Sequence, residues 1–524
     1  MKKITLPSAS VAFVVLLALG LSGSMPTDTQ ARTAKPNIVF ILADDMRKDD
    51  LKHMPKTRSV LKNKGIIFHN AFVSTPLCCP SRATIMRGQY AHNSEVWNSR
   101  GSSGGWQTYR AKGLERNNVA TRLDAAGYRT GLFGKYLNGY KGTSNKPPGW
   151  DRWFAHTDGT SYYDYKINDD GRIIHYGSTS ADYETDVIAD HAKTFIGASA
   201  MARVPFFAFV APKAPHGPYT PARRDKHAFD GIRAPRPPSF NEKNVADKPP
   251  WIRKLPRLSD ARKAEIDKRA EKRAETLQAL DDLVAGMVGK LREKRVLGNT
   301  YIFFTSDNGF QMGEHRIHAG KGRPYEGSVR VPLLARGPGV ASGRQSQKLA
   351  LNTDYLPTFT DLASAQTPGY VDGRSLRPVL KGNDTAWRSA VLLEAHDAPR
   401  NTPPYSGIRT SSGRKYVRYA GGKKELYHLG HAPYELHNSY DPNSPPATLA
   451  TRLQALKSCS KDGCRAAENG RSFLLDSPSA PLTDLMKPHI MTLGPSCPYS
   501  AECVEEEFSE VRGSKQLVHA PPNP

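Results

Sequence analysis

NIVFILADD, residues 37 to 45, contains an unbroken apolar run from Ile38 to Leu42 and ends in two adjacent aspartates. A short run without polar alternation is typical of a strand buried on both faces of a parallel sheet. Two further runs have the same form, VPFFAFVAP (204–212) and TYIFFTSDNG (300–309). Segments with helical spacing precede both. This alternation predicts an α/β fold, a mostly parallel sheet sandwiched by helices.

The two helical segments differ in length. The first covers about residues 183–197, and the second runs from 260 to beyond 290. The second keeps apolar spacings of three and four at Leu277, Leu280, Leu283, Val284, Met287 and Leu291. Its charged beginning, DARKAEIDKRAEKRAE (260–275), is typical of a solvated helix start.

Oxygen-bearing side chains follow the strands. Asp44 and Asp45 end the first run, and Asp307 and Asn308 end the third. Ligands of parallel sheets gather beyond the carboxyl ends of the strands, and carboxylate and amide oxygens suit a hard cation such as calcium or magnesium. Taken alone, each pair is more often a helix cap or a turn, so spacing leaves both interpretations open.

The pattern changes beyond residue 395. Short strands at 414–420 and 424–429 precede a helix through 447–459, which predicts a smaller antiparallel subdomain. Loop-rich insertions interrupt the part before it. These are KGTSNKPPGW (141–150), a hairpin turning at 168–171, and the proline-rich segment 232–251.

The beginning of the chain is typical of a secretory signal peptide. Two lysines follow Met1, an apolar core covers residues 11–21, and small or polar residues continue to Ala31. The apolar core is too short to span a bilayer, although an uncleaved anchor is an alternative. We therefore expect a signal peptide at 1–31, a catalytic domain at 32–395, a C-terminal subdomain and tail at 396–524, no stable membrane span, and a secreted protein.

The chain is strongly basic. Its 74 Lys and Arg against 50 Asp and Glu give a formal net charge of +24 among 524 residues. Such a charge attracts polyanions, although it also serves solubility. The sequence has no recognition-helix or RNA-binding signature, which argues against nucleic acid. A sulfated or carboxylated polysaccharide is the better partner for an exported basic protein.

The six cysteines fall into three pairs. In an oxidising compartment, Cys459–Cys464 and Cys497–Cys503 are predicted short-loop disulfides. The adjacent Cys78 and Cys79 do not fit this scheme, because a disulfide between neighbours is strained and a metal-binding thiolate pair needs intervening residues.

The segment CCPSRATIMRG (78–88) resembles the sulfatase signature CxPSR with its trailing glycine, in which the first cysteine is oxidised to formylglycine. Further segments of that family occur in order: FILADD (40–45), GKYLNGY (134–140), APKAPHGPYTPA (211–222), TSDNGFQMGEHR (305–316) and GKGRPYEGSVRVPLLARGPG (320–339). The resemblance covers about residues 35–465, and forms such as GKYLN and PPGW are closest to glucosamine-6-sulfatases and heparan endosulfatases.

The resemblance implies an alkaline-phosphatase-like fold and hydrolysis of a sulfate monoester, such as a 6-O-sulfated N-acetylglucosamine or a related glycan. Hydrated formylglycine at Cys78 would attack sulfur with one hydroxyl, and its second hydroxyl would later expel sulfate. A formylglycine-generating enzyme would be the maturation partner. One calcium ion, with magnesium as the alternative, would be held by Asp44, Asp45, Cys78, Asp307 and Asn308.

The family also implies roles for other residues. Arg82 would orient the diol, Lys135 and Lys321 would bind sulfate oxygens, and His216 would bind sulfate or protonate the bridging oxygen. Many sulfatases place a histidine where this chain has Leu137, so Asn138 is a candidate substitute. Further candidates for substrate contacts are His315, Arg316 and His318.

Two other functions remain open at this stage. One is a phosphonate or phosphate ester hydrolase on the same scaffold. The other is a catalytically silent polyanion-binding protein, whose binding would be salt-sensitive and independent of Cys78.

Overall fold

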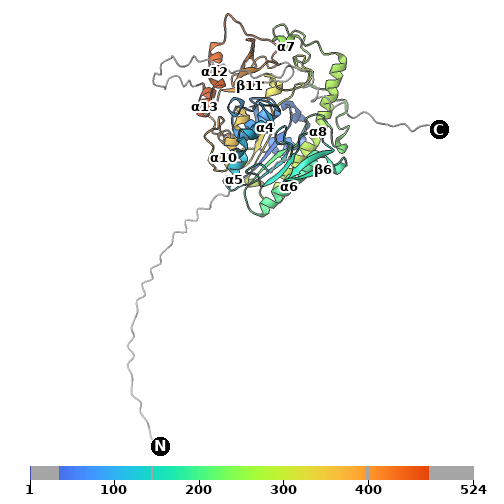
Figure 1. The fold of residues 1–524 in the computed structure, drawn as a ribbon, viewed down its shortest axis with the longest axis vertical. Coiled ribbons are helices and arrows are strands. Elements are labelled where there is room, and N and C mark those ends of the chain that lie inside the picture. Colours follow the sequence, from blue (N-terminus) through green and yellow to red (C-terminus); the bar gives the residue numbers. More distant parts are fainter. Residues whose placement is uncertain (2–34, 143–145, 397–401, 471–524) are drawn as a thin grey trace, which may run out of the picture. The chain divides into compact units, whose positions relative to one another are not determined.

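A ten-stranded mixed sheet organises the chain from Lys35 onward (Figure 1). The structure, a computed structural model, describes residues 1, 35–142, 146–396 and 402–470. The order of the strands in the sheet is β10-β2-β9-β8-β1-β7-β3-β4-β5-β6. Their bounds are β1 Asn37–Ala43, β2 Ile66–Phe72, β3 Arg129–Gly134, β4 Arg152–His156, β5 Tyr165–Asp169, β6 Arg172–Tyr176, β7 Phe206–Ala211, β8 Thr300–Ser306, β9 Leu333–Arg336 and β10 Arg344–Leu351.

The central strand β1 is parallel to both of its neighbours, β7 and β8. Its successive side chains enter two different cores. Phe40 belongs to one hydrophobic cluster, and Val39 and Ile41 belong to the other. A strand with both faces buried needs apolar residues at every position, which explains the unbroken run in its sequence.

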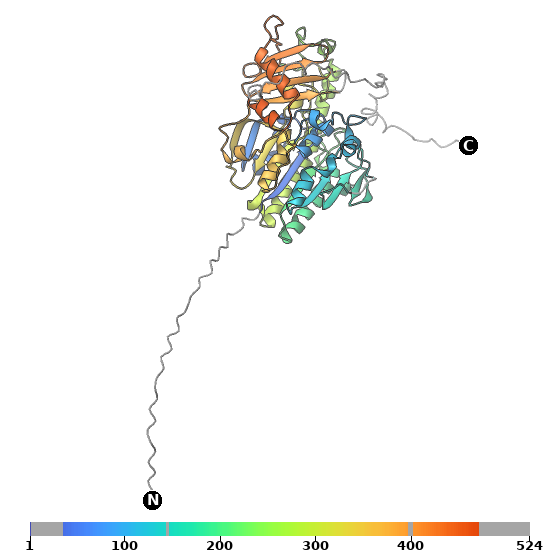
Figure 2. The same cartoon turned by 60° about the vertical axis from the view of Figure 1, so that its left-hand side comes forward.

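Helices cover both faces of the sheet, as Figure 2 shows. One core includes side chains from α2 (Cys78–Arg87), α4 (Gly105–Ala111), α5 (Val119–Ala125) and α10 (Tyr355–Leu362). The other core includes α6 (Glu184–Met201) and α8 (Asp260–Glu293). The predicted α/β sandwich is therefore confirmed.

Shorter helical segments connect these elements. They are η1 Lys48–His53, α1 Pro55–Thr57, η2 Arg58–Lys62, α3 Ala91–Ser94, η3 Leu114–Arg116, η4 Ser180–Asp182, η5 Arg223–Asp225, α7 Pro250–Arg253, η6 Leu297–Asn299, α9 Glu326–Val329, η7 Asn352–Asp354 and α11 Arg377–Lys381.

A separate four-stranded antiparallel sheet follows. Its strands, in order, are β11 Ala390–Ala395, β12 Tyr405–Thr410, β13 Arg414–Tyr419 and β14 Lys424–His428. Helices α12 (Ala447–Lys457) and α13 (Asp462–Asn469) share its hydrophobic core, and Cys459 and Cys464 form a disulfide there. The predicted antiparallel subdomain is confirmed, although β11 lies before residue 396. The exact domain division stays a prediction.

Two predictions from the sequence fall outside the described residues. These are the signal peptide at 1–31 and the disulfide Cys497–Cys503. Among the helices that the structure describes, none has the length and apolarity required to cross a bilayer.

His92 in α3 connects the helical layer to the antiparallel sheet. Its Nδ1 lies 2.9 Å from Glu394 Oε2 on β11, and its Nε2 lies 2.9 Å from the Cys459 carbonyl oxygen. Burial disfavours the charged imidazole, but Glu394 outweighs burial and raises the pKa of His92 from 6.5 to about 9. The protonated ring can donate to both partners.

We expect this contact to make the stability of the protein depend on pH. Because the pKa is higher in the folded state, the stabilisation is complete below pH 6.5 and is lost as the pH rises through about 9. The pKa change corresponds to about 3 kcal/mol. Urea unfolding between pH 6 and 10 should show a smaller decline for His92→Gln than for the unaltered chain. An equal decline in both would contradict this assignment.

Candidate active site

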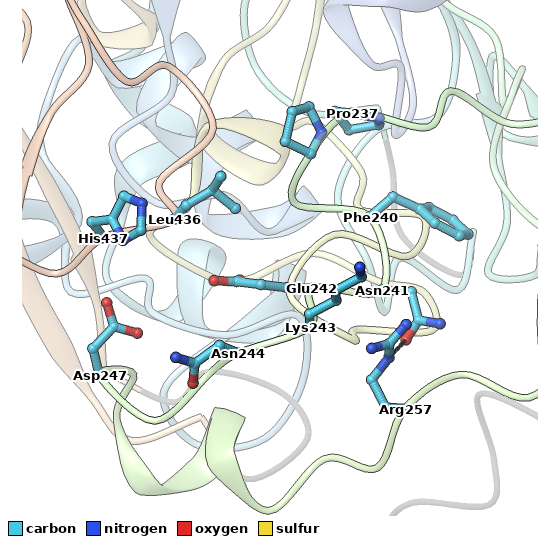
Figure 3. Close-up of a pocket in the computed structure, with 11 residues that line it drawn as sticks. Pro237, Phe240, Asn241, Glu242, Lys243, Asn244, Asp247, Arg257, Leu436 and His437 are labelled. Atoms are coloured by element: carbon cyan, nitrogen blue, oxygen red, sulfur yellow. Dashed lines mark hydrogen bonds between the residues drawn. The ribbon is translucent and has the colours of Figure 1, made fainter.

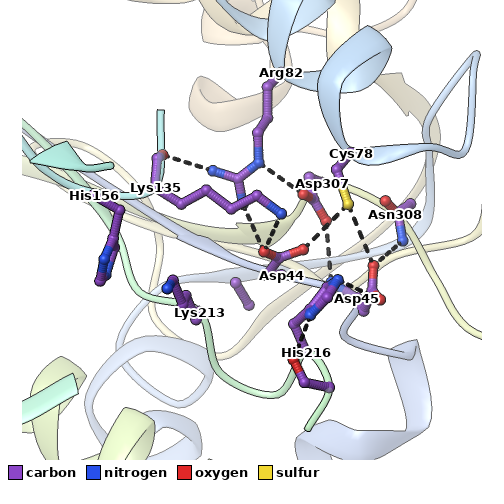
Figure 4. A network of polar contacts seen from close by, with 12 residues as sticks. Asp44, Asp45, Cys78, Arg82, Lys135, His156, Lys213, His216, Asp307 and Asn308 are labelled. Atoms are coloured by element: carbon purple, nitrogen blue, oxygen red, sulfur yellow. Dashed lines mark hydrogen bonds and ion pairs between the residues drawn. The ribbon is translucent and has the colours of Figure 1, made fainter. Parts of the chain in front are cut away.

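Polar side chains converge at the carboxyl ends of four adjacent strands (Figure 4). Asp44 and Asp45 follow β1, and Asp307 and Asn308 follow β8. Lys135 directly follows β3, and His216 lies in the loop after β7. Because β8, β1, β7 and β3 are neighbours in the sheet, segments far apart in the sequence meet at one edge.

Cys78 is the first residue of α2, which begins at this edge. Gly88 ends the helix in the left-handed conformation, with φ of 65°. The free N–H groups and the positive end of the helix dipole favour negative charge beside Cys78. The helix thereby offers electrostatic support to an anion formed on the side chain at position 78.

The environment of the Cys78 sulfur is highly charged. Its Sγ lies 2.9 Å from Lys321 Nζ, 3.4 Å from Asp44 Oδ1 and 3.8 Å from Asp45 Oδ1. Burial, followed by the charge of Asp44, raises the pKa of Cys78 well above its ordinary value. A protonated thiol is a weak nucleophile, so an unmodified Cys78 is poorly suited to nucleophilic catalysis.

Cys79 has different surroundings, although it is the adjacent residue. It is fully buried in the helix-covered core, and burial raises its pKa to about 12. Its role is therefore that of a small packed side chain.

Three cations neutralise the carboxylates. Lys135 Nζ donates to Asp44 Oδ2 at 2.6 Å, and Lys321 Nζ donates to Asp45 Oδ1 at 2.7 Å. The third cation is Arg82. Burial acts to raise the pKa of Asp44, but Lys135, His216 and Arg82 hold it well below its ordinary value.

Arg82 organises one side of the site. Its Nε donates to Asp307 Oδ2 at 2.8 Å, and its Nη1 donates to the Lys135 carbonyl at 2.8 Å. Its Nη2 lies 3.6 Å from Asp44 and forms no hydrogen bond to the described residues. The guanidinium therefore holds the ends of β8 and β3 together. Its Nη2 stays available to an additional acceptor.

The oxygen atoms of this cluster, rather than the whole donor set, suit a hard cation. One ligand atom from each of Asp44, Asp45, Cys78 and His216 lies within 4.8 Å of the others. Asp307 is not part of that group, but its Oδ1 accepts a hydrogen bond from the Asp45 N–H at 3.1 Å. Asn308 Nδ2 donates to Asp45 Oδ1 at 2.7 Å, whereas its buried Oδ1 has no hydrogen-bond partner among the described residues. A buried amide oxygen without a donor is costly unless a cation satisfies it.

His216 exposes one ring nitrogen to the carboxylates. Its Nδ1 lies 2.7 Å from the Gly217 carbonyl, which can only accept a hydrogen bond, so Nδ1 carries the proton. Its Nε2 lies 3.8 Å from Asp45 Oδ2. Burial lowers the pKa of His216 despite the neighbouring carboxylates. Nε2 is thus the nitrogen available for proton exchange.

Arg273 supports the site from α8. The sequence predicted that the charged run 260–275 is a solvated helix start, and this prediction is wrong at Arg273. Arg273 is 1% exposed, and its Nη2 donates to the Asp45 carbonyl at 2.7 Å and to Asp50 Oδ2 at 2.6 Å. Asp45 has a φ of 64°, an uncommon conformation that this contact stabilises. The burial of Arg273 could not be recognised from the charged run, because it depends on which residues pack against the helix.

The antiparallel sheet holds the loop that carries Lys321. Lys415 on β13 has its Nζ 2.9 Å from the Pro324 carbonyl and 2.7 Å from Glu435. On the other side, the Gly322 N–H donates to the Pro76 carbonyl at 2.9 Å. The subdomain thus fixes the loop against the segment that precedes Cys78.

The contacts of the four candidates for substrate binding involve residues outside this cluster. His315 Nδ1 lies 2.6 Å from Glu242, Arg316 donates to the backbone carbonyls of residues 242, 243 and 255, and His318 pairs with Glu265 at 3.0 Å. The Asn138 carbonyl accepts from the Trp106 N–H, and its buried Oδ1 has no partner among the described residues. Their roles stay predictions.

His156 was not identified from the sequence. It ends β4, beside the end of β3, and Figure 4 places it on the Lys135 side of the site. Its Nε2 lies 2.8 Å from Glu184, and burial, followed by the charge of Lys213, lowers its pKa to about 4. Leu137, by contrast, is buried in the core. A neutral imidazole thus lies near Lys135, but it comes from β4 and not from position 137, which follows β3.

Several known proteins resemble this chain. Residues 36–365 match the family model for sulfatases, and residues 313–461 match the model for the C-terminal part of N-sulphoglucosamine sulphohydrolase. The human N-acetylglucosamine-6-sulfatase is 33% identical over 511 residues, which cover 88% of this chain and 91% of that protein.

Two further similarities are informative. The Drosophila melanogaster extracellular sulfatase SULF-1 homolog is 37% identical over 376 residues, which cover 70% of this chain but only 33% of the fly protein. The solved structure of BT4656 in complex with its substrate D-glucosamine-2-N,6-O-disulfate has a TM-score of 0.69 at 23% identity, and covers 83% of this chain and 99% of that chain. At that identity the likeness shows the fold alone.

The family match covers more than half of the chain, and the human relative is aligned over most of both proteins. The motifs found in the sequence, from the run at 37–45 to the segment at 320–339, therefore belong to one inherited scaffold, and the chain is a member of the sulfatase family of sulfuric ester hydrolases.

Proposed function

We propose that this protein is an exported sulfatase that removes 6-O-sulfate from N-acetylglucosamine or related units of sulfated glycans, with formylglycine at position 78 and one bound calcium ion. The observation that carries the proposal is the cluster of two carboxylates and a lysine around the Cys78 sulfur. A third carboxylate, and an amide oxygen without a hydrogen-bond partner among the described residues, adjoin this cluster through Asp45. Relatives named for 6-sulfated glucosamine and for extracellular sulfatases support the substrate and the export.

The proposed residue at position 78 supplies what a thiol cannot. An aldehyde hydrate offers an oxygen nucleophile and a second hydroxyl through which sulfate can leave, whereas the cysteine here stays protonated. The helix dipole of α2 and the available Nη2 of Arg82 would offset negative charge that develops on this side chain.

The cation would be held by oxygens of Asp44, Asp45, Asp307 and Asn308 together with the modified residue 78. Calcium, or magnesium, would polarise oxygen atoms and lower the pKa of a bound hydroxyl. Its charge would also replace Lys135 and Lys321 as the partners of Asp44 and Asp45. Both ammonium groups would then be available for the sulfate oxygens.

His216 would handle the proton of the leaving alcohol. Its Nδ1 proton is committed to Gly217, so a proton gained at Nε2 is the one that can be passed to the bridging oxygen. Bound sulfate, an anion, would favour this protonation, because a nearby negative charge raises the pKa of an imidazole.

Steady-state kinetics on matched substrates test the proposal. We expect turnover of N-acetylglucosamine-6-sulfate, and preference for an aryl sulfate over the corresponding phosphonate ester by at least about 100-fold in kcat/KM. Preference for the phosphonate would instead indicate the alternative ester hydrolase. Binding of heparin without turnover of any ester would indicate a silent polyanion-binding protein. Fractionation of the native host, followed by detection of the mature chain outside the cytoplasm, tests export separately.

A further inference from the structure

A pocket lies in a part of the molecule that the proposed chemistry does not use (Figure 3). Its volume is about 470 Å³. The proline-rich segment 237–247 forms most of its wall, Arg257 contributes from the following loop, and residues 436–437 contribute from beyond the antiparallel sheet. Volumes of this size are typical of pockets for small ligands.

The pocket wall is tied to the loop between the two parts of the active site. The His315 N–H donates to the Ser239 carbonyl at 2.7 Å, and the Asn241 N–H donates to the Gly313 carbonyl at 2.8 Å. Residues 313–315 lie between the metal-ligand candidate Asn308 and the sulfate-binding candidate Lys321 in the sequence. The pocket wall is therefore hydrogen-bonded to the loop that connects these two candidates.

The acidic groups of the pocket already have partners. Glu242 is buried, with Oε2 2.6 Å from His315 Nδ1 and Oε1 3.6 Å from Lys248 Nζ. Asp247 accepts a hydrogen bond from the Asn438 N–H at 2.7 Å and lies 3.5 Å from the same Lys248 Nζ. The two carboxylates therefore share one lysine, and each has a second hydrogen-bonding partner.

The basic groups of the pocket, in contrast, lack acidic partners. Lys243, Arg257 and His437 are exposed, and none of them forms an ion pair with any residue in the described ranges 35–142, 146–396 and 402–470. The side-chain oxygen of Asn241 accepts from Arg257 Nε at 3.2 Å, which orients the guanidinium. The pocket therefore has an excess of positive charge, and the guanidinium of Arg257 is held in position to donate hydrogen bonds.

Apolar surface accompanies these charges. Pro237, Pro238, Phe240 and Leu436 line the pocket, and the Arg236 guanidinium lies 3.9 Å from the centre of the Phe240 ring. Apolar surface can pack against the C–H face of a sugar ring, while cations and amides bind its anionic substituents and hydroxyl groups.

We propose that this pocket is a subsite for a further anionic sugar unit of the substrate chain, whose sulfate or carboxylate group is bound by Lys243 and Arg257. The identity of the ligand as a sulfated glycan rests on the proposed function. The subsite makes the enzyme prefer chains over single sugars, because a second contact adds binding energy to the same substrate.

Equilibrium binding to the full chain carrying Cys78→Ala tests the subsite without any turnover. A heparin-derived tetrasaccharide is titrated calorimetrically at 0.15 M salt into this chain and into the same chain with Lys243→Ala and Arg257→Ala. We expect about tenfold weaker binding after the double substitution. The matched control is Arg253→Ala with Lys254→Ala, which removes the same charge from the same segment outside the pocket. An unchanged affinity, or an equal loss in the control, would overturn the proposal.

Two further comparisons complete the test. Desulfated and carboxyl-reduced tetrasaccharides identify the bound anion. If sulfate is the bound group, the double substitution should no longer weaken binding of the desulfated tetrasaccharide, and the carboxyl-reduced one tests carboxylate in the same way. If the double substitution still weakens the binding of both, the subsite is refuted. In the active enzyme, the ratio of kcat/KM for the tetrasaccharide to that for the monosaccharide should fall about tenfold on the double substitution. If no saccharide is hydrolysed, the proposed function fails while the binding experiment still reports on the pocket.

Discussion

Cys78→Ala should reduce sulfate release by at least about 10³-fold, whereas Cys79→Ser should keep activity within about threefold. The first change removes the side chain from which the proposed nucleophile forms, at the start of α2 and 3.4 Å from Asp44. The second affects a side chain buried in the core, where a hydroxyl group costs about 1–2 kcal/mol of stability. Release of N-acetylglucosamine from its 6-sulfate is the measurement.

Cys78→Ser separates the proposed chemistry from simple loss of a side chain. A serine that escapes modification can accept sulfate once but has no second hydroxyl with which to expel it. We expect at most a single turnover, seen as a stoichiometric burst that leaves a sulfated peptide from the 75–87 region in mass spectra. The same spectra of the active enzyme should show an aldehyde or its hydrate at position 78. Full activity with an unmodified thiol there would refute the mechanism.

Removal of divalent cations should abolish activity, and calcium should restore it. Burial, followed by the charge of Asp44, raises the pKa of Asp307 to about 6. A bound cation would offset both effects, because it favours the ionised carboxylate. A cation that binds only the folded chain at 100 times its Kd also stabilises it by about 2.7 kcal/mol. Calcium should therefore raise the thermal midpoint of the chelated protein by several degrees, independently of turnover.

Asp307→Asn provides the matched variant. It keeps the shape of the side chain and an acceptor for the Asp45 N–H, but it removes one of the three carboxylate charges. We expect activity to fall at least about 100-fold, and the thermal shift with calcium to shrink at a fixed calcium concentration. Undiminished activity after exhaustive chelation, together with no calcium-dependent shift in the unaltered chain, would contradict a metal site.

The sequence anticipated those parts of the protein that depend on local pattern. The run at 37–45 is apolar at every position from 38 to 43 because β1 is covered on both faces, so its composition reports its environment directly. The hairpin at 168–171 and the long helix α8 were also predicted, because turn residues and helical spacing act over short distances. The family motifs marked the residues that meet beside Cys78.

Other residues could be recognised only in three dimensions. Arg273 belongs to a charged run that resembles an exposed helix surface, yet its guanidinium is buried and donates a hydrogen bond to the backbone carbonyl of Asp45. His156 belongs to no family motif found here, and it approaches Lys135 only because β3 and β4 are paired. Lys415 supports the Lys321 loop from a different sheet, almost a hundred residues away in the sequence.

The sequence by itself therefore determined the fold class, the family and the residues that carry the proposed chemistry, because apolar runs and short motifs encode these locally. The tertiary structure alone decided which charges are paired. It buried Arg273, satisfied Glu242 through His315 and Lys248, and left Lys243 and Arg257 without acidic partners in the described chain. The physical reason is that the energy of a charge depends on its distance from other charges and from water, and neither distance is fixed until the strands and loops have packed.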